Sequence, residues 1–247
     1  MDAKRLCAVL VGMMAMAGCA PVRLEVPEPL ARDAAPLKVE KKYRHLLSTR
    51  GTLKAGEYEA AFDEDGATTN RLGVGDAQLC HTEREYRFAL ASAGRAAPLE
   101  VECREQMTGQ QVQLAAFHGE LTMGTAQNRV SCRVRGGAGQ VDLQPAPGSA
   151  WVGTERVEGQ VTVGAVHLSA ESLGYDTQGV ASVPYPGFQL LRGGEVVGVV
   201  QTQKPLQLWL SPSLRPEERE AAVLGAFSLL LQTTWTFEGP RDCERQA

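Results

Sequence analysis

The 247-residue chain has few aromatic residues and little net charge. Aromatic side chains make up 6% of the sequence, and the formal net charge is -4. This charge argues against a nucleic-acid-binding protein, because neutralising phosphates requires a basic face. Hydrophobic residues account for 43% and charged residues for 22% of the chain, which excludes a disordered polymer. Glycine is plentiful, with 26 residues, and this composition favours short strands and turns over a helical bundle.

The chain also lacks the short motifs that mark common catalytic sites. It contains no G-x-S-x-G, no G-x-x-x-x-G-K and no H-E-x-x-H, so serine hydrolases, P-loop proteins and zinc peptidases lose their usual support. Histidine is scarce and scattered over His45, His81, His118 and His167. None has a second histidine at strand or helix spacing, so no metal site is predicted. The sequence therefore predicts no catalytic residue and no cofactor.

The N-terminus is typical of an export signal. Lys4 and Arg5 precede the apolar stretch Leu6–Met16, whose eleven residues are too few to span a bilayer as a helix. The stretch ends in Met16-Ala17-Gly18-Cys19, where small residues precede a cysteine. Such a pattern predicts a secretory signal over residues 1–18.

This ending resembles the lipobox of bacterial lipoproteins, although Met16 stands where that family usually has leucine. The resemblance implies that Cys19 becomes the first mature residue, with acyl chains on its sulfur and its amine. Ala20 follows the cysteine, and a residue other than aspartate there favours the outer membrane in enterobacterial lipoproteins. We therefore expect an exported chain anchored by lipid to the bacterial outer membrane, facing the periplasm. The alternative is an ordinary cleaved signal in which Cys19 is incidental.

Proline marks the segment after the signal. Residues 19–37 contain Pro21, Pro27, Pro29 and Pro36, with few side chains of core size. Such a segment is expected to be extended and semi-rigid, and it is interpreted as a tether. The remaining residues, 38–247, are predicted to form a single β-rich domain.

Four cysteines lie within this domain, namely Cys80, Cys103, Cys132 and Cys243. An even number in an exported chain predicts up to two disulfides, for which three pairings exist. The pairing of Cys103 with Cys132 and of Cys80 with Cys243 is favoured. Zinc binding would require closely spaced ligand pairs, which these positions lack.

Alternating apolar and polar residues predict antiparallel strands through the domain. A hairpin over residues 84–104 places three pairs on one face: Leu90 with Leu99, Phe88 with Val101, and Tyr86 with Cys103. A second hairpin over Phe188–Gln201 turns at Gly193-Gly194, with Arg192 facing Glu195 and Leu190 facing Val197. Further strands are predicted at Val157–Val163 and Leu206–Leu210, each with apolar residues at alternate positions.

One helix is predicted over residues 216–232. Pro216 suits a first helical turn, and Glu217, Glu218 and Glu220 complement its positive end. Because the apolar residues of Ala221–Leu231 point nearly all round the axis, the helix must be wrapped by protein. A meander of antiparallel strands with a late apolar helix is similar to the barrel-around-helix plan of tubby-like and phospholipid-scramblase-like domains. The fold class is therefore mainly β, an antiparallel meander or barrel with the helix in or against it.

Three arginines form the best candidate binding patch. Arg129, Arg133 and Arg135 share one face of a strand whose other face carries Val130, Cys132 and Val134. Guanidinium groups bind lipid phosphates or cell-wall carboxylates, although a solvated face paired with glutamates explains them as well. We expect a non-enzymatic binding or scaffold lipoprotein with an envelope protein, lipid or cell-wall partner. The alternatives are a carrier of hydrophobic molecules, which needs an open cavity, and an envelope hydrolase, which needs a polar cleft.

Overall fold

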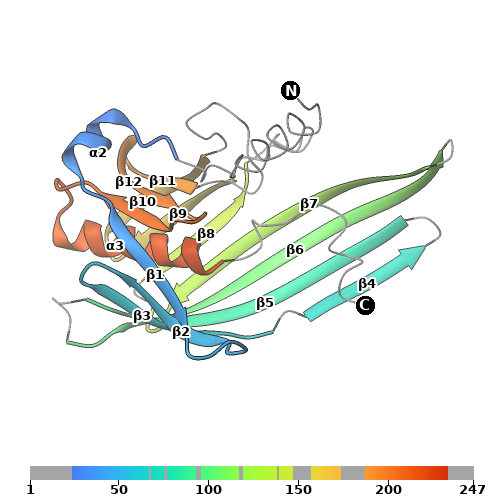
Figure 1. The fold of residues 1–247 in the computed structure, drawn as a ribbon, viewed down its shortest axis with the longest axis horizontal. Coiled ribbons are helices and arrows are strands. Elements are labelled where there is room, and N and C mark those ends of the chain that lie inside the picture. Colours follow the sequence, from blue (N-terminus) through green and yellow to red (C-terminus); the bar gives the residue numbers. More distant parts are fainter. Residues whose placement is uncertain are drawn as a thin grey trace, which may run out of the picture.

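A computed structural model describes residues 24–66, 68–74, 77–92, 96–116, 119–137, 139–146, 157–173 and 187–232. This part of the chain forms one antiparallel sheet and two helices (Figure 1). The elements, in chain order, are α2 (Glu28–Asp33), β1 (Leu37–Tyr43), β2 (Arg50–Ala55), β3 (Tyr58–Glu64), β4 (Thr68–Val74), β5 (Ala77–Ala91), β6 (Leu99–Ala116), β7 (Gly119–Val134), β8 (Gly139–Pro145), β9 (Val157–Val163), β10 (Val166–Leu173), β11 (Gly187–Arg192), β12 (Glu195–Gln201), β13 (Gln207–Leu210) and α3 (Pro216–Leu231).

Twelve of the thirteen strands close into a barrel. The sheet runs in the order β3-β2-β1-β13-β12-β11-β10-β9-β8-β7-β6-β5, and β3 pairs again with β5 to complete the ring. Strand β4 lies outside the ring, because it pairs with the first half of β5. The predicted fold class is therefore confirmed in its closed form, an antiparallel barrel in which the pairing of β3 with β5 closes the ring.

Three strands extend far beyond the barrel. Strands β5, β6 and β7 contain 15, 18 and 16 residues, so β6 spans about 60 Å at the usual rise per residue. Their outer halves, together with β4, form a four-stranded sheet that projects from one side of the barrel (Figure 1). The long strands thus supply both a barrel wall and a projecting surface.

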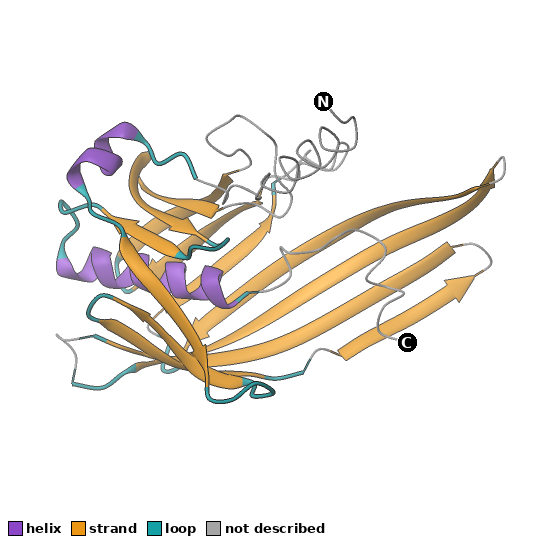
Figure 2. Cartoon of the chain, viewed as in Figure 1, coloured by secondary structure: helices purple, strands orange, loops and turns teal. Residues whose placement is uncertain are grey.

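Helix α3 lies inside the barrel, with strands on its opposite sides (Figure 2). Every residue from Ala221 to Leu231 is buried. The hydroxyl of Tyr86 on β5 donates to the Ser228 carbonyl at 3.0 Å, whereas Gly225 faces Val161 on β9 and Leu190 on β11. Since β5 and β11 are diametrically opposed in the ring of twelve, the helix spans the interior. The prediction of a wrapped helix is confirmed.

The predicted strand registers hold with one exception. All three pairs of the first hairpin occur, with Tyr86 opposite Cys103, and Arg192 faces Glu195 across the glycine turn. However, Leu190 pairs with Gly198 rather than with Val197, and Leu191 pairs with Val196. The prediction was wrong because a β-bulge inserts Val197 as an extra residue.

The segment predicted as an extended tether contains a helix instead. Residues 28–33 form α2, and Pro27 and Pro29 stand at its N-cap and in its first turn, where proline is tolerated. This segment packs on the outer face of β12 and β13 through a second apolar cluster of Leu24, Leu30, Ala34, Val199 and Trp209. The tether prediction was wrong here because covering Val199 and Trp209 stabilises a folded segment. Residues 19–23, including Cys19, lie outside the described residues, as does the lipobox.

None of the described helices is sufficiently long and apolar to cross a membrane.

Candidate functional site

The three predicted arginines lie on the outer face of the barrel wall. Arg129, Arg133 and Arg135 are exposed, whereas the alternate residues Val130, Cys132 and Val134 are buried in the core. This separation follows the period of two along β7, in which successive side chains point to opposite faces. The predicted arrangement of the patch is therefore present.

Only part of this patch carries unpaired charge. Arg135 pairs with Glu100 and, at 2.8 Å, with Glu102, and these interactions raise the pKa of the Arg135 guanidinium. Neither Arg129 nor Arg133 forms an ion pair within the described residues. Arg135 therefore belongs to a solvated ion-pair network with Glu100 and Glu102, whereas Arg129 and Arg133 are exposed without an ion pair in the described part of the chain.

Arg133 borders a groove of about 540 Å³ on the outer face of β5, β6 and β7. Charged side chains of both signs dominate its lining, which comprises Asp65, Glu85, Tyr86, Arg87, Glu102, Cys103, Arg104, Ser131 and Arg133. Arg104 is held by Glu83 and Glu85, and Arg87 lies 3.6 Å from Asp63. Groups of both signs line this groove, so it suits a polar partner rather than an apolar molecule.

A second cluster of charged residues lies inside the barrel, beside the end of α3. Its members are Lys41 from β1, Glu64 from β3, Arg84 from β5 and Glu105 from β6. Arg84 contacts Glu64 at 3.2 Å and Glu105 at 3.1 Å, while Lys41 contacts Glu64 at 2.9 Å. The Glu105 side chain is fully buried, and that of Arg84 is 10% exposed. Such burial requires the pairing, because an isolated charge would be costly there.

The inner cluster contacts the C-terminal end of helix α3. Arg84 donates to the Leu231 carbonyl at 3.4 Å, which places a positive charge at the negative end of the helix dipole. Next to it, burial and the nearby Glu105 carboxylate raise the pKa of the Tyr86 hydroxyl well above its usual value. Tyr86 is therefore a neutral hydrogen-bond donor, and the cluster positions α3.

Sequence reasoning missed the inner cluster, although its signal was present. Arg84 stands two residues before Tyr86, and Glu105 two residues after Cys103, so the alternation that predicted the hairpin also places both inward. They are directly opposite each other in the observed register. A charged pair at the same register position was the available clue.

The histidines remain apart in the described part of the chain. His81 lies beside Thr108, His167 lies beside Thr162, and His45 lies in the β1–β2 loop. The described residues contain no group of three or more side chains suited to a metal ion. His118 is outside them.

Cys103 and Cys132 form a disulfide between β6 and β7. The two residues are direct register partners, which explains why the pairing favoured from the sequence occurs. Of the second predicted pair, Cys243 and the side chain of Cys80 lie outside the described residues, so that pairing stays a prediction.

Comparison with known proteins found no matching family model, no matching curated protein and no matching solved structure.

Proposed function

We propose that this protein is a lipid-anchored lipoprotein of the bacterial cell envelope that acts as a non-enzymatic binding or scaffold module. The observation that carries the proposal is the filled interior of the barrel. Phe227, Leu224 and Leu231 of α3 have no exposed surface and occupy the space that a carrier would keep open for its cargo. Binding is thereby left to the outer surface, which favours a scaffold over a carrier of hydrophobic molecules.

The outer groove beside Arg133 is the proposed partner-binding surface. Its charged lining and the two unpaired arginines of β7 suit carboxylate or phosphate groups on an envelope protein, a lipid or the cell wall. The resemblance to tubby-like and scramblase-like domains points the same way, because that plan implies a binding or scaffolding domain. The closed barrel around a buried helix supports this resemblance.

Anchoring at Cys19 belongs to the same proposal and rests on Met16-Ala17-Gly18-Cys19. Packing of Leu24 on the barrel leaves only residues 20–23 between the acylated Cys19 and the folded domain. The five steps along the chain from Cys19 to Leu24 reach at most about 18 Å, so the barrel would be held close to the outer membrane. More than one acyl chain would be required for stable anchoring.

The anchor is tested by mass spectrometry of the mature N-terminus. We expect a chain that begins at Cys19 and carries the mass of a diacylglyceryl group and a further acyl chain. Cleavage at another position, or an unmodified cysteine, would exclude lipid anchoring.

Native mass spectrometry and cross-linking in cells distinguish the scaffold function from the carrier function. The scaffold proposal predicts a purified chain without a bound hydrophobic molecule, and discrete cross-linked partners when a photoreactive amino acid replaces Arg133. The same amino acid at Glu57, on the β2–β3 turn away from the groove, is the control and should give none of these products. A stoichiometric hydrophobic ligand would instead favour the carrier.

A further inference from the structure

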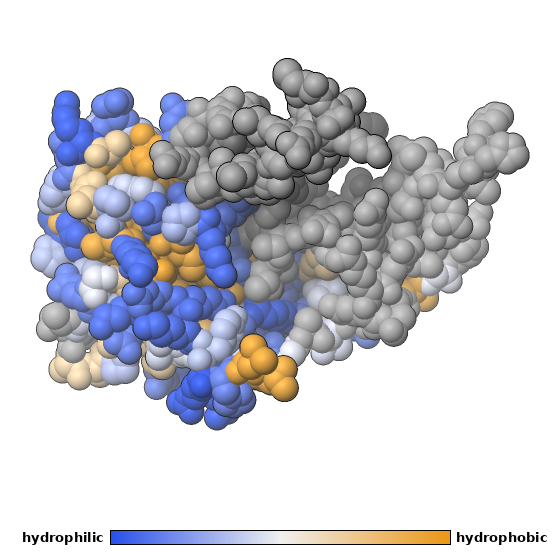
Figure 3. Space-filling model, viewed as in Figure 1, coloured by the Kyte–Doolittle hydropathy of each residue, from blue (hydrophilic) through white to orange (hydrophobic). Residues whose placement is uncertain are grey.

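The loop between β1 and β2, residues 44–49, holds two leucines in water. Leu46 and Leu47 are 98% and 90% exposed. Figure 3 shows an apolar patch among hydrophilic residues at the lower edge of the molecule, where Figure 1 places the end of β1 and this loop. Adjacent leucines at a protruding tip favour an interaction site over ordinary surface.

Hydrogen bonds hold this loop in one shape. The Ser48 amide donates to the His45 carbonyl at 3.0 Å, and the Arg44 amide donates to the Arg50 carbonyl at 2.9 Å. The Ser48 hydroxyl donates to the Arg50 carbonyl and accepts from the Arg50 amide, both at 3.0 Å. The tip is therefore preorganised, and several of its backbone groups are already paired, as entry into an apolar medium requires.

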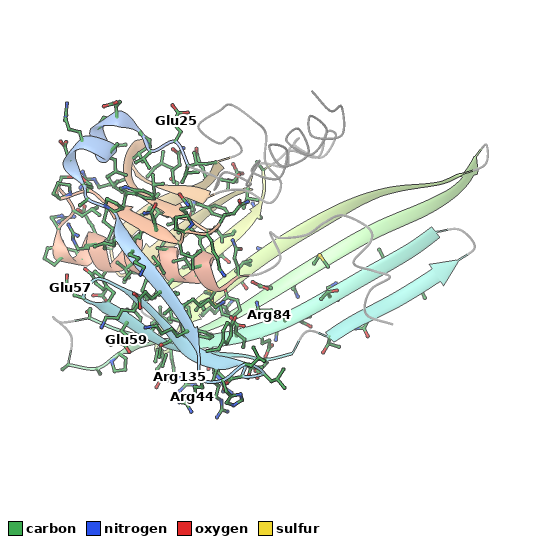
Figure 4. The ribbon with its side chains drawn as sticks, viewed as in Figure 1. Glu25, Arg44, Glu57, Glu59, Arg84 and Arg135 are labelled. Carbon is green, nitrogen blue, oxygen red and sulfur yellow. A yellow bond between two sulfur atoms is a disulfide. The ribbon has the colours of Figure 1, made fainter. Side chains whose placement is uncertain are left out.

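One unpaired cation, Arg44, lies beside the tip. Residues 42–50 contain three cationic side chains and no acidic one, in a chain of net charge -4. Lys42 pairs with Glu40 at 2.8 Å and Arg50 with Asp63 at 2.9 Å, but Arg44 has no ion pair within the described residues. Figure 4 shows Arg44 at the lower edge of the molecule, beside Arg135. Tyr43, which is 44% exposed, lies at the base of the loop.

We propose that this loop docks on an anionic bilayer surface, with Leu46 and Leu47 in the acyl region and Arg44 among the lipid phosphates. The order along the loop matches the layers of a bilayer, because apolar side chains form the tip while cationic and aromatic side chains lie behind it. A negative surface also satisfies Arg44. This contact goes beyond the proposed function and does not depend on acylation of Cys19.

The test reads the environment of the loop itself. The purified full chain carrying L46W is mixed with phosphatidylcholine vesicles, with and without phosphatidylglycerol, and its fluorescence is quenched by brominated acyl chains. E57W, on the β2–β3 turn far from the loop (Figure 4), is the matched control. We expect a blue shift and strong quenching for L46W with phosphatidylglycerol, weaker effects without it, and neither effect for E57W.

Two further variants separate the apolar and electrostatic parts. L46S/L47S should reduce loop-dependent partitioning into vesicles by on the order of a hundredfold. R44Q should reduce, several-fold, the increase in vesicle binding that phosphatidylglycerol produces. If the indole at position 46 behaves like the one at position 57, the loop proposal is overturned. The lipid-anchor proposal survives that result, because a chain held to the vesicle only by its N-terminus would also leave both indoles in water. Equal quenching with and without phosphatidylglycerol overturns the role of Arg44.

Discussion

Single residues at the two ends of α3 hold the helix in the barrel. At its N-terminus, the Glu218 carboxylate accepts hydrogen bonds from the Arg215 side chain at 2.9 Å, the Arg215 amide at 3.0 Å and Arg192 at 3.0 Å. These bonds, those from Arg215 above all, lower the pKa of Glu218 to about 2. At the other end, Arg84 and Tyr86 bind helix carbonyls. Both ends are thus held by charged or polar side chains from the surrounding chain.

The Glu218 pKa predicts how stability depends on pH. Because the folded-state pKa lies below that of an unfolded glutamate, ionised Glu218 stabilises the fold above about pH 4.5, and this contribution is lost as the pH falls towards 2. E218Q should therefore be less stable than the wild type near pH 7 and equal to it below about pH 2, as measured by urea unfolding. E217Q, at an exposed position, is the control and should change little. A constant difference across this pH range would contradict the assignment.

Gly225 allows a close approach between α3 and the barrel wall. A Cβ atom at this position would lie 2.8 Å from a γ-methyl group of Val161, so overpacking should exceed the gain of about 1 kcal/mol in helix propensity. We expect G225A to lower the free energy of unfolding by about 1 kcal/mol. The penalty should shrink in a V161A background, as a double-mutant cycle would show. Stabilisation by G225A would mean that the helix is not packed against β9.

At the scale of elements, the sequence predicted those parts of the fold that repeat a simple period. Alternation alone paired Tyr86 with Cys103, and the all-round apolar character of Ala221–Leu231 required enclosure. The bulge after Leu190 could not be foreseen, because an extra residue changes the register without changing the composition. The sequence did not predict helix α2, because the prolines of this segment are typical of an extended tether. The segment is folded because it packs over Trp209, a contact that local sequence does not indicate.

The candidate site was predictable to a smaller extent. The outer position of Arg133 followed from the alternation along β7, but the neutralisation of Arg135 by Glu100 and Glu102 depends on strand β6 lying beside it. The inner cluster joins side chains from β1, β3, β5 and β6. Such a cluster is defined by barrel closure, which local sequence does not encode.

A disulfide links strands β6 and β7. Cys103 and Cys132 are separated by 29 residues, and loss of a bond that closes such a loop costs about 3 to 4 kcal/mol in the chain-entropy model. C103A/C132A should lose this amount of stability in denaturant unfolding. Thiol labelling of the unfolded, unreduced wild type should find Cys80, Cys103, Cys132 and Cys243 all blocked. A free thiol at Cys80 or Cys243 would contradict the second predicted disulfide.

At the scale of the whole molecule, the barrel, the projecting sheet and the N-terminal segment have separate roles. The barrel encloses α3, while β4 and the outer halves of β5, β6 and β7 extend the surface. The segment with α2 covers apolar residues on the outside of β12 and β13. This division buries the apolar side chains in the interior and under α2, and it keeps the charged groove on the outer face accessible, which is the arrangement that the scaffold proposal requires.

The central claim is that α3 fills the barrel, and thermal melting of F227D in the full chain tests it most directly. Phe227 is fully buried, so the substitution removes a large apolar side chain and buries a carboxylate; together these should cost several kcal/mol of a total of about 5 to 15. L46D, at a 98% exposed position, is the control and should melt like the wild type. We predict that F227D melts far below both or fails to fold, and that limited proteolysis degrades it. An F227D melting temperature equal to that of the wild type would contradict the enclosed helix.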